Sequence, residues 1–247
     1  MTFTTMKTFP LLLTTLVLST YYPIHAKDAV GMVLPFKEVV VSASTENTVK
    51  QVAVELGDPI KKGDLLAKLD SRIHELQVKR FERVLVLSES AYKSSSLLVK
   101  DNIISREEAL KAEVERDLAQ SQLDVAKVEL DQQQVLSPLD GVVVEVLKEE
   151  GETVKKSEEM FVVINIDQVF LQLYLPADQA YSLQKGQELD VRFPVMPDNP
   201  TFPGTVYFID SRIDATSGLL RTRILLKNPG HKIRAGMRGH VTLPGKG

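Results

Sequence analysis

Two lysine pairs are the residues of this chain whose positions most suggest covalent chemistry. Lys61 and Lys62 lie in LGDPIKKGD (56–64), and Lys155 and Lys156 lie in EGETVKKSE (150–158). In both segments a glycine followed by an acidic residue interrupts a β-branched run, which predicts a tight turn between two strands. A lysine in such a turn can carry a covalently attached cofactor, but a charged turn residue is more often only solvated. The position of the turns in the fold decides between these two interpretations.

A second group has the side chains of a soft-metal site. His231 and His240 flank Met237 in HKIRAGMRGH (231–240), and thioether and imidazole groups are ligands that copper and silver accept. Their spacing does not match a recognised ligand motif. We therefore expect structural or exposed residues here and predict no metal site.

Asp210 and Asp214 are close enough in sequence to be considered as an acid–base pair. No histidine or nucleophile accompanies them, and DSRIDATSG (210–218) is typical of a turn in which aspartates bond to nearby backbone groups. The sequence has neither a glycine-rich phosphate loop nor a nucleophile motif. These observations predict a protein that is not an enzyme and that uses no cofactor.

Composition narrows the class of protein further. The 247 residues are 43% hydrophobic and 26% charged, with a net charge of -3, so the basic footprint of a nucleic-acid-binding protein is missing. The chain has no cysteine, which excludes disulfides, thiolate metal sites and a lipid anchor on an N-terminal cysteine.

The first 26 residues have the pattern of a signal peptide. Lys7 precedes an apolar run (9–22) that leads to PIHA (23–26). The run is shorter than the roughly 18 residues needed to cross a bilayer, which favours cleavage after Ala26 over an uncleaved anchor. We therefore expect an exported protein.

An internal repeat defines the middle of the chain. A shift of 94 residues aligns 45–66 with 139–160 without a gap, and the two lysine pairs coincide. Asn47 and Gly141 share a column, and because both residue types tolerate positive φ we expect a backbone kink there. Neither half could bury a core alone, so the pattern predicts one β-sandwich in two halves, 27–70 and 135–167.

The segment between the halves (71–134) is predicted to be a helical hairpin. It contains no glycine or proline between Ser71 and Gln134. Asn102 is expected to turn the chain, and Ser105 with Glu108 forms a capping box for the second arm. Each arm would be roughly 40–45 Å long.

Apolar residues on the arms follow the heptad spacing of a coiled coil. On the first arm we predict a seam that runs through Ile73, Gln77, Arg80, Val84, Leu87, Ala91, Ser94 and Leu98. The second arm has two stripes, one of Val114, Leu118, Ser121, Val125, Val128 and Gln132, and a neighbouring one of Ala119, Leu123, Ala126 and Leu130. Either one stripe packs on the first arm and leaves the other for a further helix, or both stripes widen a single seam.

The last part of the chain (168–247) has a sequence pattern typical of a small β-barrel. Five strand-like runs (168–175, 187–193, 202–209, 219–226 and 237–243) are separated by turn residues, and a short helix is predicted within 176–184. The fold class is therefore mainly β: a split lipoyl-like sandwich with an inserted α-helical coiled-coil hairpin, followed by a β-barrel.

This order of elements resembles the periplasmic adaptor subunits, or membrane fusion proteins, of tripartite efflux and secretion systems. The likeness is carried by EVVVSAST (38–45), VELGDPIKKGDLLAKLD (54–70), SPLDGVV (137–143), GETVKK (151–156), FPGTVYFIDSRIDATSGLLRTRI (202–224) and RAGMRGHVTL (234–243). It covers nearly everything from residue 30 to 243. The half-motif is also similar to biotinyl and lipoyl carriers, which attach their cofactor at the turn joining the two halves. Here that joint is the start of the hairpin, so the lysine pairs are interpreted as solvated turn residues.

The resemblance implies a protein that connects components of the inner and the outer membrane. An inner-membrane transporter, expected to be of the resistance-nodulation-division (RND) type, would contact the barrel loops. An outer-membrane channel would contact the hairpin tip. The subunits would form a homo-oligomeric ring in the periplasm, at the inner membrane. For the channel contact the resemblance implies Leu98 and Ser105, and we expect Asn102 and Ile104 to take part with them. For the transporter contact we expect Asp214, Thr216, Gly218, Arg234 and Met237.

Two departures and two alternatives accompany the resemblance. Family members carry an arginine at the hairpin end where this chain has Ser94. Many also continue past the barrel into a membrane-proximal domain, so here we expect the barrel to engage the transporter either alone or with the help of a second adaptor. The alternatives are an adaptor of an ABC exporter, and a periplasmic metal-binding or delivery protein on the same scaffold.

Overall fold

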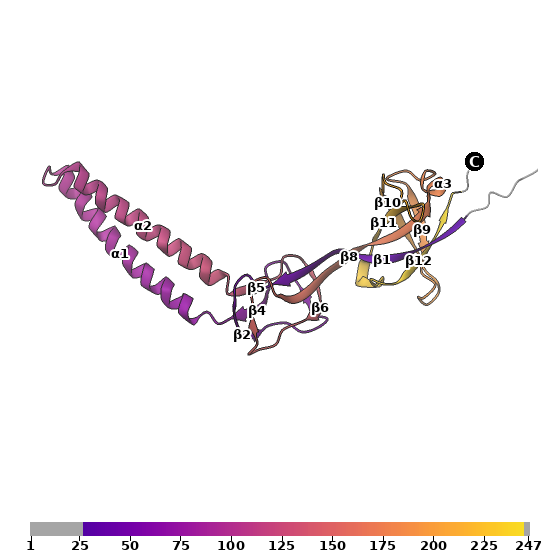
Figure 1. The fold of residues 1–247 in the computed structure, drawn as a ribbon, viewed down its shortest axis with the longest axis horizontal. Coiled ribbons are helices and arrows are strands. Elements are labelled where there is room, and N and C mark those ends of the chain that lie inside the picture. Colours follow the sequence, from indigo (N-terminus) through magenta and orange to yellow (C-terminus); the bar gives the residue numbers. More distant parts are fainter. Residues whose placement is uncertain (1–26, 245–247) are drawn as a thin grey trace, which may run out of the picture.

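The computed structural model describes residues 27–244, so the predicted signal peptide lies outside the described residues. The molecule is elongated, with a helical hairpin at one end, a β-sandwich in the middle and a β-barrel at the other end (Figure 1). Both ends of the described chain lie at the barrel, far from the hairpin tip. The protein is mainly β with an inserted helical hairpin, as predicted.

Two long strands run through both β domains. β1 (Lys27–Ser42) pairs with β12 (Arg238–Leu243) in the barrel and with β8 (Glu159–Pro176) along the rest of its length. The N-terminal half of β1 therefore closes the barrel, whereas residues 27–36 were assigned to the sandwich from the sequence. That assignment missed a strand because the sequence pattern alone does not tell which sheet a continuous run of extended residues joins.

The sandwich is built from two sheets that mix its two halves. One contains β3 (Pro59–Ile60), β6 (Gly141–Val146), β8 and β1, and the other contains β5 (Gln134–Leu136), β4 (Leu65–Leu69), β2 (Asn47–Val52) and β7 (Thr153–Val154). β2 pairs with β4 and β7, and β6 pairs with β8 and β3. The repeat is visible in these bounds, since a shift of 94 residues superposes β2 on β6 and β3 on β7. Each half thus completes a sheet of the other.

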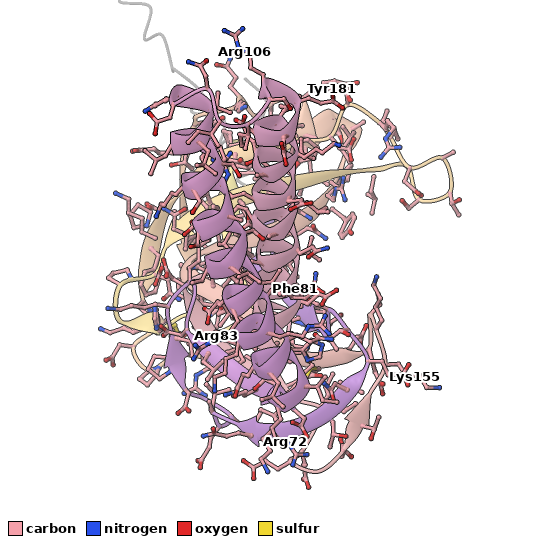
Figure 2. All side chains as sticks on the ribbon, turned by 90° about the vertical axis from the view of Figure 1, so that its left-hand side faces the viewer. Arg72, Phe81, Arg83, Arg106, Lys155 and Tyr181 are labelled. Atoms are coloured by element: carbon pink, nitrogen blue, oxygen red, sulfur yellow. The ribbon has the colours of Figure 1, made fainter. Side chains whose placement is uncertain are left out.

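The duplicated turns repeat their hydrogen bonds as well. The carboxylate of Asp64 accepts the backbone N–H of Lys61 at 2.8 Å, and the carboxylate of Glu158 accepts that of Lys155 at 2.7 Å. All four lysine side chains are exposed, and Lys155 projects away from the sandwich in Figure 2. Neither turn is the joint at which the hairpin is inserted, which lies between β4 and β5, so the backbone of the lysine pairs has a structural role and their side chains are solvated.

The expected kink at the shared column is absent. Neither Asn47 nor Gly141 has a positive φ. Gly141 is required for another reason: a Cβ there would lie 2.8 Å from the carbonyl carbon of Ile164 and closer still to its oxygen. The glycine therefore allows two strands of the sandwich to approach each other. Asn47, its counterpart in the first half, instead donates side-chain hydrogen bonds to Asp70 and Gln133.

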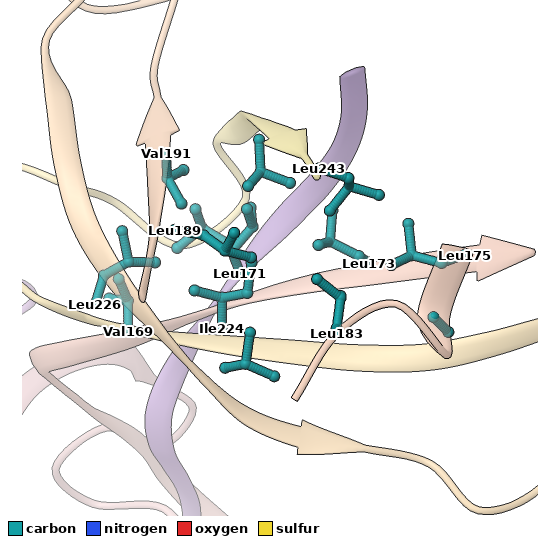
Figure 3. Close-up of a cluster of buried hydrophobic side chains, with 14 of the residues drawn as sticks. Val169, Leu171, Leu173, Leu175, Leu183, Leu189, Val191, Ile224, Leu226 and Leu243 are labelled. Atoms are coloured by element: carbon teal, nitrogen blue, oxygen red, sulfur yellow. The ribbon is translucent and has the colours of Figure 1, made fainter. Parts of the chain in front are cut away.

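Within residues 27–244 the barrel has six strands. β1, β12, β9 (Glu188–Arg192), β10 (Thr201–Ile209), β11 (Leu219–Lys227) and β8 pair in this order, and β8 returns to β1. α3 (Ala177–Ala180) and the 3₁₀ turn η1 (Pro229–His231) lie in the connections. Alternate side chains of the strands fill the interior (Figure 3), including Leu171, Leu173, Val191, Ile224 and Leu243. This period of two is what a closed sheet requires.

The hairpin consists of α1 (Arg72–Lys100) and α2 (Arg106–Asp131). Its seam is formed by Val78, Phe81 and Leu85 of α1 with Leu123, Ala126 and Leu130 of α2. The seam predicted on the first arm keeps the right spacing but is wrong by one residue, because Ile73 and Leu87 are exposed.

On α2 the stripe of Ala119, Leu123, Ala126 and Leu130 packs inward, and the stripe of Val114, Leu118, Val125 and Val128 is exposed. The view that both stripes widen one seam is therefore wrong. Small alanines are packed inward because they make room for Phe81 and Leu85 from the other helix.

Candidate docking surfaces at the hairpin tip and the barrel rim

The hairpin tip is a compact turn stabilised by backbone capping. The N–H of Ile103 donates to the carbonyl of Leu98 at 2.8 Å and that of Asn102 to the carbonyl of Val99 at 3.0 Å, which is a Schellman motif. Asn102 has a φ of 57°, as this motif requires at its turning residue. The hydroxyl of Ser105 accepts the N–H of Glu108 at 3.1 Å. Asn102 turns the chain and Ser105 caps α2, as the sequence predicted.

The exposed apolar side chains at this tip are not all those named from the sequence. Leu97 and Ile103 are 60% and 65% exposed, Leu98 is 37% exposed, and Ile104 is half-buried. Sequence reasoning missed Leu97 and Ile103. No local pattern reveals the exposure of these two residues, because a hydrophobic residue after the left-handed position of a Schellman motif more often packs back on the last turn of the helix. The tip therefore offers a small apolar surface to a partner.

A shallow groove of about 360 Å³ follows one face of the hairpin nearer its base. Gln77 and Arg80 of α1 and Gln122 and Val125 of α2 line it. Each of these residues stands one position before a seam residue. Because the two helices are antiparallel, this offset places the side chains of both helices on the same face of the hairpin.

A second hollow, of about 600 Å³, lies at the barrel rim between β10 and β11. Its charged residues are already paired. The carboxylate of Asp210 accepts the backbone N–H of Arg212 and, at 3.0 Å, a guanidinium N–H of Arg221. Arg212 and Arg221 hold the pKa of Asp210 below its usual range.

Asp214 is the centre of the loop in this hollow. One of its oxygens accepts the backbone N–H groups of Thr216 and Ser217 and the Ser217 hydroxyl, and these bonds lower the pKa of Asp214. Gly218 follows with a φ of 69°. Asp210 and Asp214 are thus both ionised turn acceptors. This arrangement does not suit an acid–base pair, in which the two pKa values would have to differ.

The two predicted groups of transporter contacts lie at opposite ends of the barrel. Leu219, next to the Asp214 loop, pairs with Pro176 at the end of β8 that is distant from the sandwich. Arg234 and Met237 form a turn that precedes β12 near the sandwich, where Gly236 donates to the carbonyl of Val33 at 2.8 Å. The structure therefore does not bring Arg234 and Met237 together with the Asp214 loop.

The histidine–methionine group does not form a cluster of ligands. His231 Nε2 lies 2.9 Å from Asp167 Oδ1, and this contact lowers the pKa of Asp167. The sulfur of Met237 accepts the Arg234 N–H at 3.4 Å, and His240 lies on β12 opposite Arg192 and Val30. Residues 27–244 contain no group of three histidine, cysteine or acidic side chains that could hold a metal ion.

The sequence matches two family models in succession. Residues 37–165 match the CzcB-like barrel-sandwich hybrid domain, and residues 168–247 match the CusB-like beta-barrel domain. The first covers the sandwich with its inserted hairpin and the second covers most of the barrel.

The chain belongs to the periplasmic adaptor, or membrane fusion protein, family.

Named relatives of the adaptor are efflux components. It is 23% identical over 231 residues to the solvent efflux pump periplasmic linker SrpA of Pseudomonas putida, covering 87% of this chain and 60% of that protein. It is 24% identical over 224 residues to an uncharacterised protein of Haemophilus influenzae, covering 88% of this chain and 57% of the relative. The chain thus spans less than two thirds of the length of these curated relatives. The toluene efflux pump protein TtgG of Pseudomonas putida, which is also 23% identical over 231 residues, is likewise named a periplasmic linker protein.

Solved structures share the adaptor's fold. A MacA–MexA chimera containing the Pseudomonas aeruginosa MexA α-hairpin domain superposes with a TM-score of 0.80 at 20% identity, covering 89% of this chain and 81% of the other. The membrane fusion protein Spr0693 of Streptococcus pneumoniae R6 gives 0.72 at 20% identity, covering 90% and 100%. None of the helices within residues 27–244 is both long and apolar enough to cross a membrane.

Proposed function

We propose that this adaptor links an inner-membrane exporter to an outer-membrane channel across the periplasm, without catalysing a reaction. One observation carries the proposal: the two ends of the described chain lie together at the barrel, and the hairpin tip lies at the opposite end of the long axis (Figure 1). Two docking surfaces so far apart suit a molecule that holds two partners at a fixed distance. α1 alone, with 29 residues, contributes about 43 Å to this distance.

The inner-membrane partner is proposed to be a transporter of the RND type. The barrel matches a family named for RND systems, and this domain would lie nearest the inner membrane in the proposed orientation. The contact would involve Asp214, Thr216 and Gly218, because their loop is exposed at the end of the barrel distant from the sandwich. Arg234 and Met237 lie at the other end and would contact a neighbouring subunit or a transporter that reaches around the barrel.

The outer-membrane partner is proposed to dock on the hairpin tip. Leu98, Asn102, Ile104 and Ser105 form or support the turn, and the exposed Leu97 and Ile103 supply its apolar surface. Exposed apolar groups on a rigid turn are suited to burial by a partner protein. Several subunits would have to surround one channel, so we propose a homo-oligomeric ring.

The experiment compares two substitutions on the hairpin in cells that carry the transporter and the channel. Ile103→Asp places a charge in the proposed contact and should abolish chemical cross-linking of the adaptor to the channel. Ile73→Asp is the matched control, because Ile73 is 70% exposed but lies at the base of the hairpin, far from the tip. The adaptor should stay abundant and folded in both strains. Unchanged cross-linking of the Ile103→Asp variant would contradict the proposed tip contact.

A further inference from the structure

The sandwich and the barrel are connected by a short two-stranded junction. Among the described residues the chain passes between the two domains only along β1 and along β8 (Figure 1). The regular pairing of these strands is interrupted between the pairs Lys37–Asn165 and Pro35–Val169, where β8 has three residues and β1 has one. Such a bulge bends a strand pair and disrupts its hydrogen-bond ladder. The junction is therefore the place on the long axis where the angle between the two β domains can change.

A cleft of about 460 Å³ lies beside the junction. The sandwich contributes Lys62 and Asp140 to its lining, and the two strands contribute Lys37 and Asp167. The hydrophobic cores of the sandwich and the barrel are two separate clusters. The two domains are thus not held at one angle by a shared apolar core, and polar contacts at the junction become important.

A chain of polar contacts leads across the junction from the barrel to the sandwich. Nε2 of His231, in the turn η1 of the barrel, lies 2.9 Å from Oδ1 of Asp167 in the bulge. The other oxygen of Asp167 accepts Nδ2 of Asn165 at 3.0 Å. The same nitrogen donates to the carbonyl of Asp140 in the sandwich at 2.8 Å. The side chains of Asp167 and Asn165 therefore bridge the two domains.

The barrel turn is attached to the bulge through Asn228. The N–H of Asn228 donates to the carbonyl of Asp167 and its Nδ2 donates to the carbonyl of Ile166, both at 2.9 Å. His231 has a φ of 53°, which is uncommon for a residue other than glycine, and this conformation belongs to the turn that presents its ring to Asp167. Because the turn holds the backbone at 166–167, bending is expected between Asp167 and Asn165, where only side chains form the bridge.

His231 is the group at this junction that changes its charge near neutral pH. The other charged groups in the cleft or next to the junction are Lys37, Lys62, Asp140, Lys227 and Lys232. Lysine and aspartate side chains ordinarily keep their charge between about pH 5 and 8, whereas histidine titrates in this range. The contact with His231 lowers the pKa of Asp167, so this carboxylate stays ionised while the histidine titrates.

We propose that the contact between His231 and Asp167 makes the junction a pH-sensitive hinge, which is fixed at mildly acid pH and bends more freely as the pH rises. A protonated His231 forms an ion pair with Asp167 and holds this carboxylate against Asn165. When the imidazole loses its proton the attraction is lost, so the stabilisation disappears as the pH rises through the histidine range. The two side chains are 47% and 65% exposed. The ratio of the fixed to the bent arrangement should therefore change only by about two- to fivefold, as for an exposed ion pair.

The hinge itself does not depend on the proposed function, but its consequence rests on it. The hairpin projects from the sandwich, and α1 alone, with 29 residues, is about 43 Å long. A small change of angle at the junction therefore moves the hairpin tip much farther than it moves the sandwich. The pH would thus adjust how often the tip lies in the direction of its partner.

Pulsed EPR on the purified protein, without any partner, measures this angle. Because the chain contains no cysteine, two spin labels can be attached through Lys155→Cys in the sandwich and Tyr181→Cys in the barrel, which are both exposed positions. We expect a narrow distance distribution at about pH 5.5 and a second, broader component at about pH 8. The ratio of the two components should change by about two- to fivefold.

Two variants remove the ion pair in different ways. His231→Gln keeps a hydrogen-bond donor but cannot be protonated, and Asp167→Asn removes the carboxylate and leaves His231 in place. Each should show at about pH 5.5 the distribution that the natural chain shows at about pH 8. His240→Gln is the matched control, because His240 is also a barrel histidine but lies on β12 opposite Arg192, and it should keep the full response to pH.

Three results would overturn the inference. They are a distribution that is the same at both pH values, a distribution that becomes narrower as the pH rises, and a response to pH that persists in His231→Gln. The proposed function would stand in each case, because the measurement involves neither the transporter nor the channel. A failed cross-link at the hairpin tip would contradict the proposed function and leave the hinge intact.

Discussion

Nδ2 of Asn47 lies 2.9 Å from Oε1 of Gln133, and this hydrogen bond joins the sandwich to the base of the hairpin. The same Asn47 nitrogen donates to the carbonyl of Asp70 at 2.8 Å, and Gln133 Nε2 donates to the carbonyl of Glu129 at 3.0 Å. The network thus connects the residue before the hairpin with the last turn of α2. Gln133 is only 1% exposed, so this polar contact at the base of the hairpin is shielded from water.

Removal of this contact should destabilise the protein at the hairpin base. Gln133→Leu leaves the Asn47 amide with one acceptor and should lower the free energy of unfolding by about 1–3 kcal/mol, the cost of an unpaired buried group. Urea unfolding measures the change. Gln134→Leu is the control because Gln134 is the next residue and is exposed. Equal stability of the two variants would contradict this role of Gln133.

The column that Asn47 shares with Gly141 leads to a second prediction. In Gly141→Ala the new methyl group would collide with the backbone of Ile164, and two sandwich strands would have to move apart. Gly57→Ala is the comparison, because a methyl group there meets open space but the φ of 92° is strained. The second variant should lose about 1 kcal/mol, and the first should lose more or fail to fold. Thermal unfolding measures both, and a Gly141→Ala variant as stable as Gly57→Ala would show that the strands can separate without cost.

Asp70 gives a prediction about pH. The Arg72 guanidinium and the Arg72 backbone N–H both donate to this carboxylate and lower the pKa of Asp70 to about 2. Because the folded-state pKa lies below the ordinary value of 3.8, the ionised form stabilises the folded state above that value, and its contribution is lost as the pH falls from about 4 to 2. Side-chain carboxyl NMR should place the midpoint of Asp70 near 2. A midpoint near 3.8 would mean that the pair with Arg72 does not form in solution, and Asp70→Asn should remove this part of the acid transition.

The turn that contains Lys61 and Lys62 leads to a prediction about stability: its acidic side chain should matter and its lysine side chain should not. Lys62→Ala removes only a solvated ammonium group and should change neither stability nor export. Asp64→Ala removes the acceptor of the Lys61 N–H and should cost about 1 kcal/mol. Thermal unfolding and an export assay of both variants test the contrast. Loss of export in the folded Lys62→Ala variant would instead point to chemistry at the lysine.

The fold could be predicted in large part because the repeat and the helix signals are local. The shift of 94 residues predicted that β2 corresponds to β6 and β3 to β7 in the two halves, and Asn102 with Ser105 predicted the tip, since these features depend on residues close in sequence. The features that failed depend on contacts between distant segments. The strand within 27–36 joins the barrel only because β12 returns beside it, and the coiled-coil phase depends on whether alanine or valine faces Phe81.

The candidate sites were predictable to a lesser degree. Turn chemistry indicated the roles of Asp214 and Asn102, which are local. The exposure of Leu97 and Ile103, and the separation of Arg234 from the Asp214 loop, follow from the three-dimensional arrangement and have no local signal.

The central claim is that the two ends of the molecule contact proteins of two different membranes. The most direct test places a photo-cross-linking amino acid at Ile103 in one strain and at Thr216 in another, each expressed with the neighbouring transporter and channel genes. We predict that the Ile103 position links to an outer-membrane protein and the Thr216 position to an inner-membrane transporter. If both positions linked to the same protein, or if each linked to the opposite membrane, the account would be contradicted.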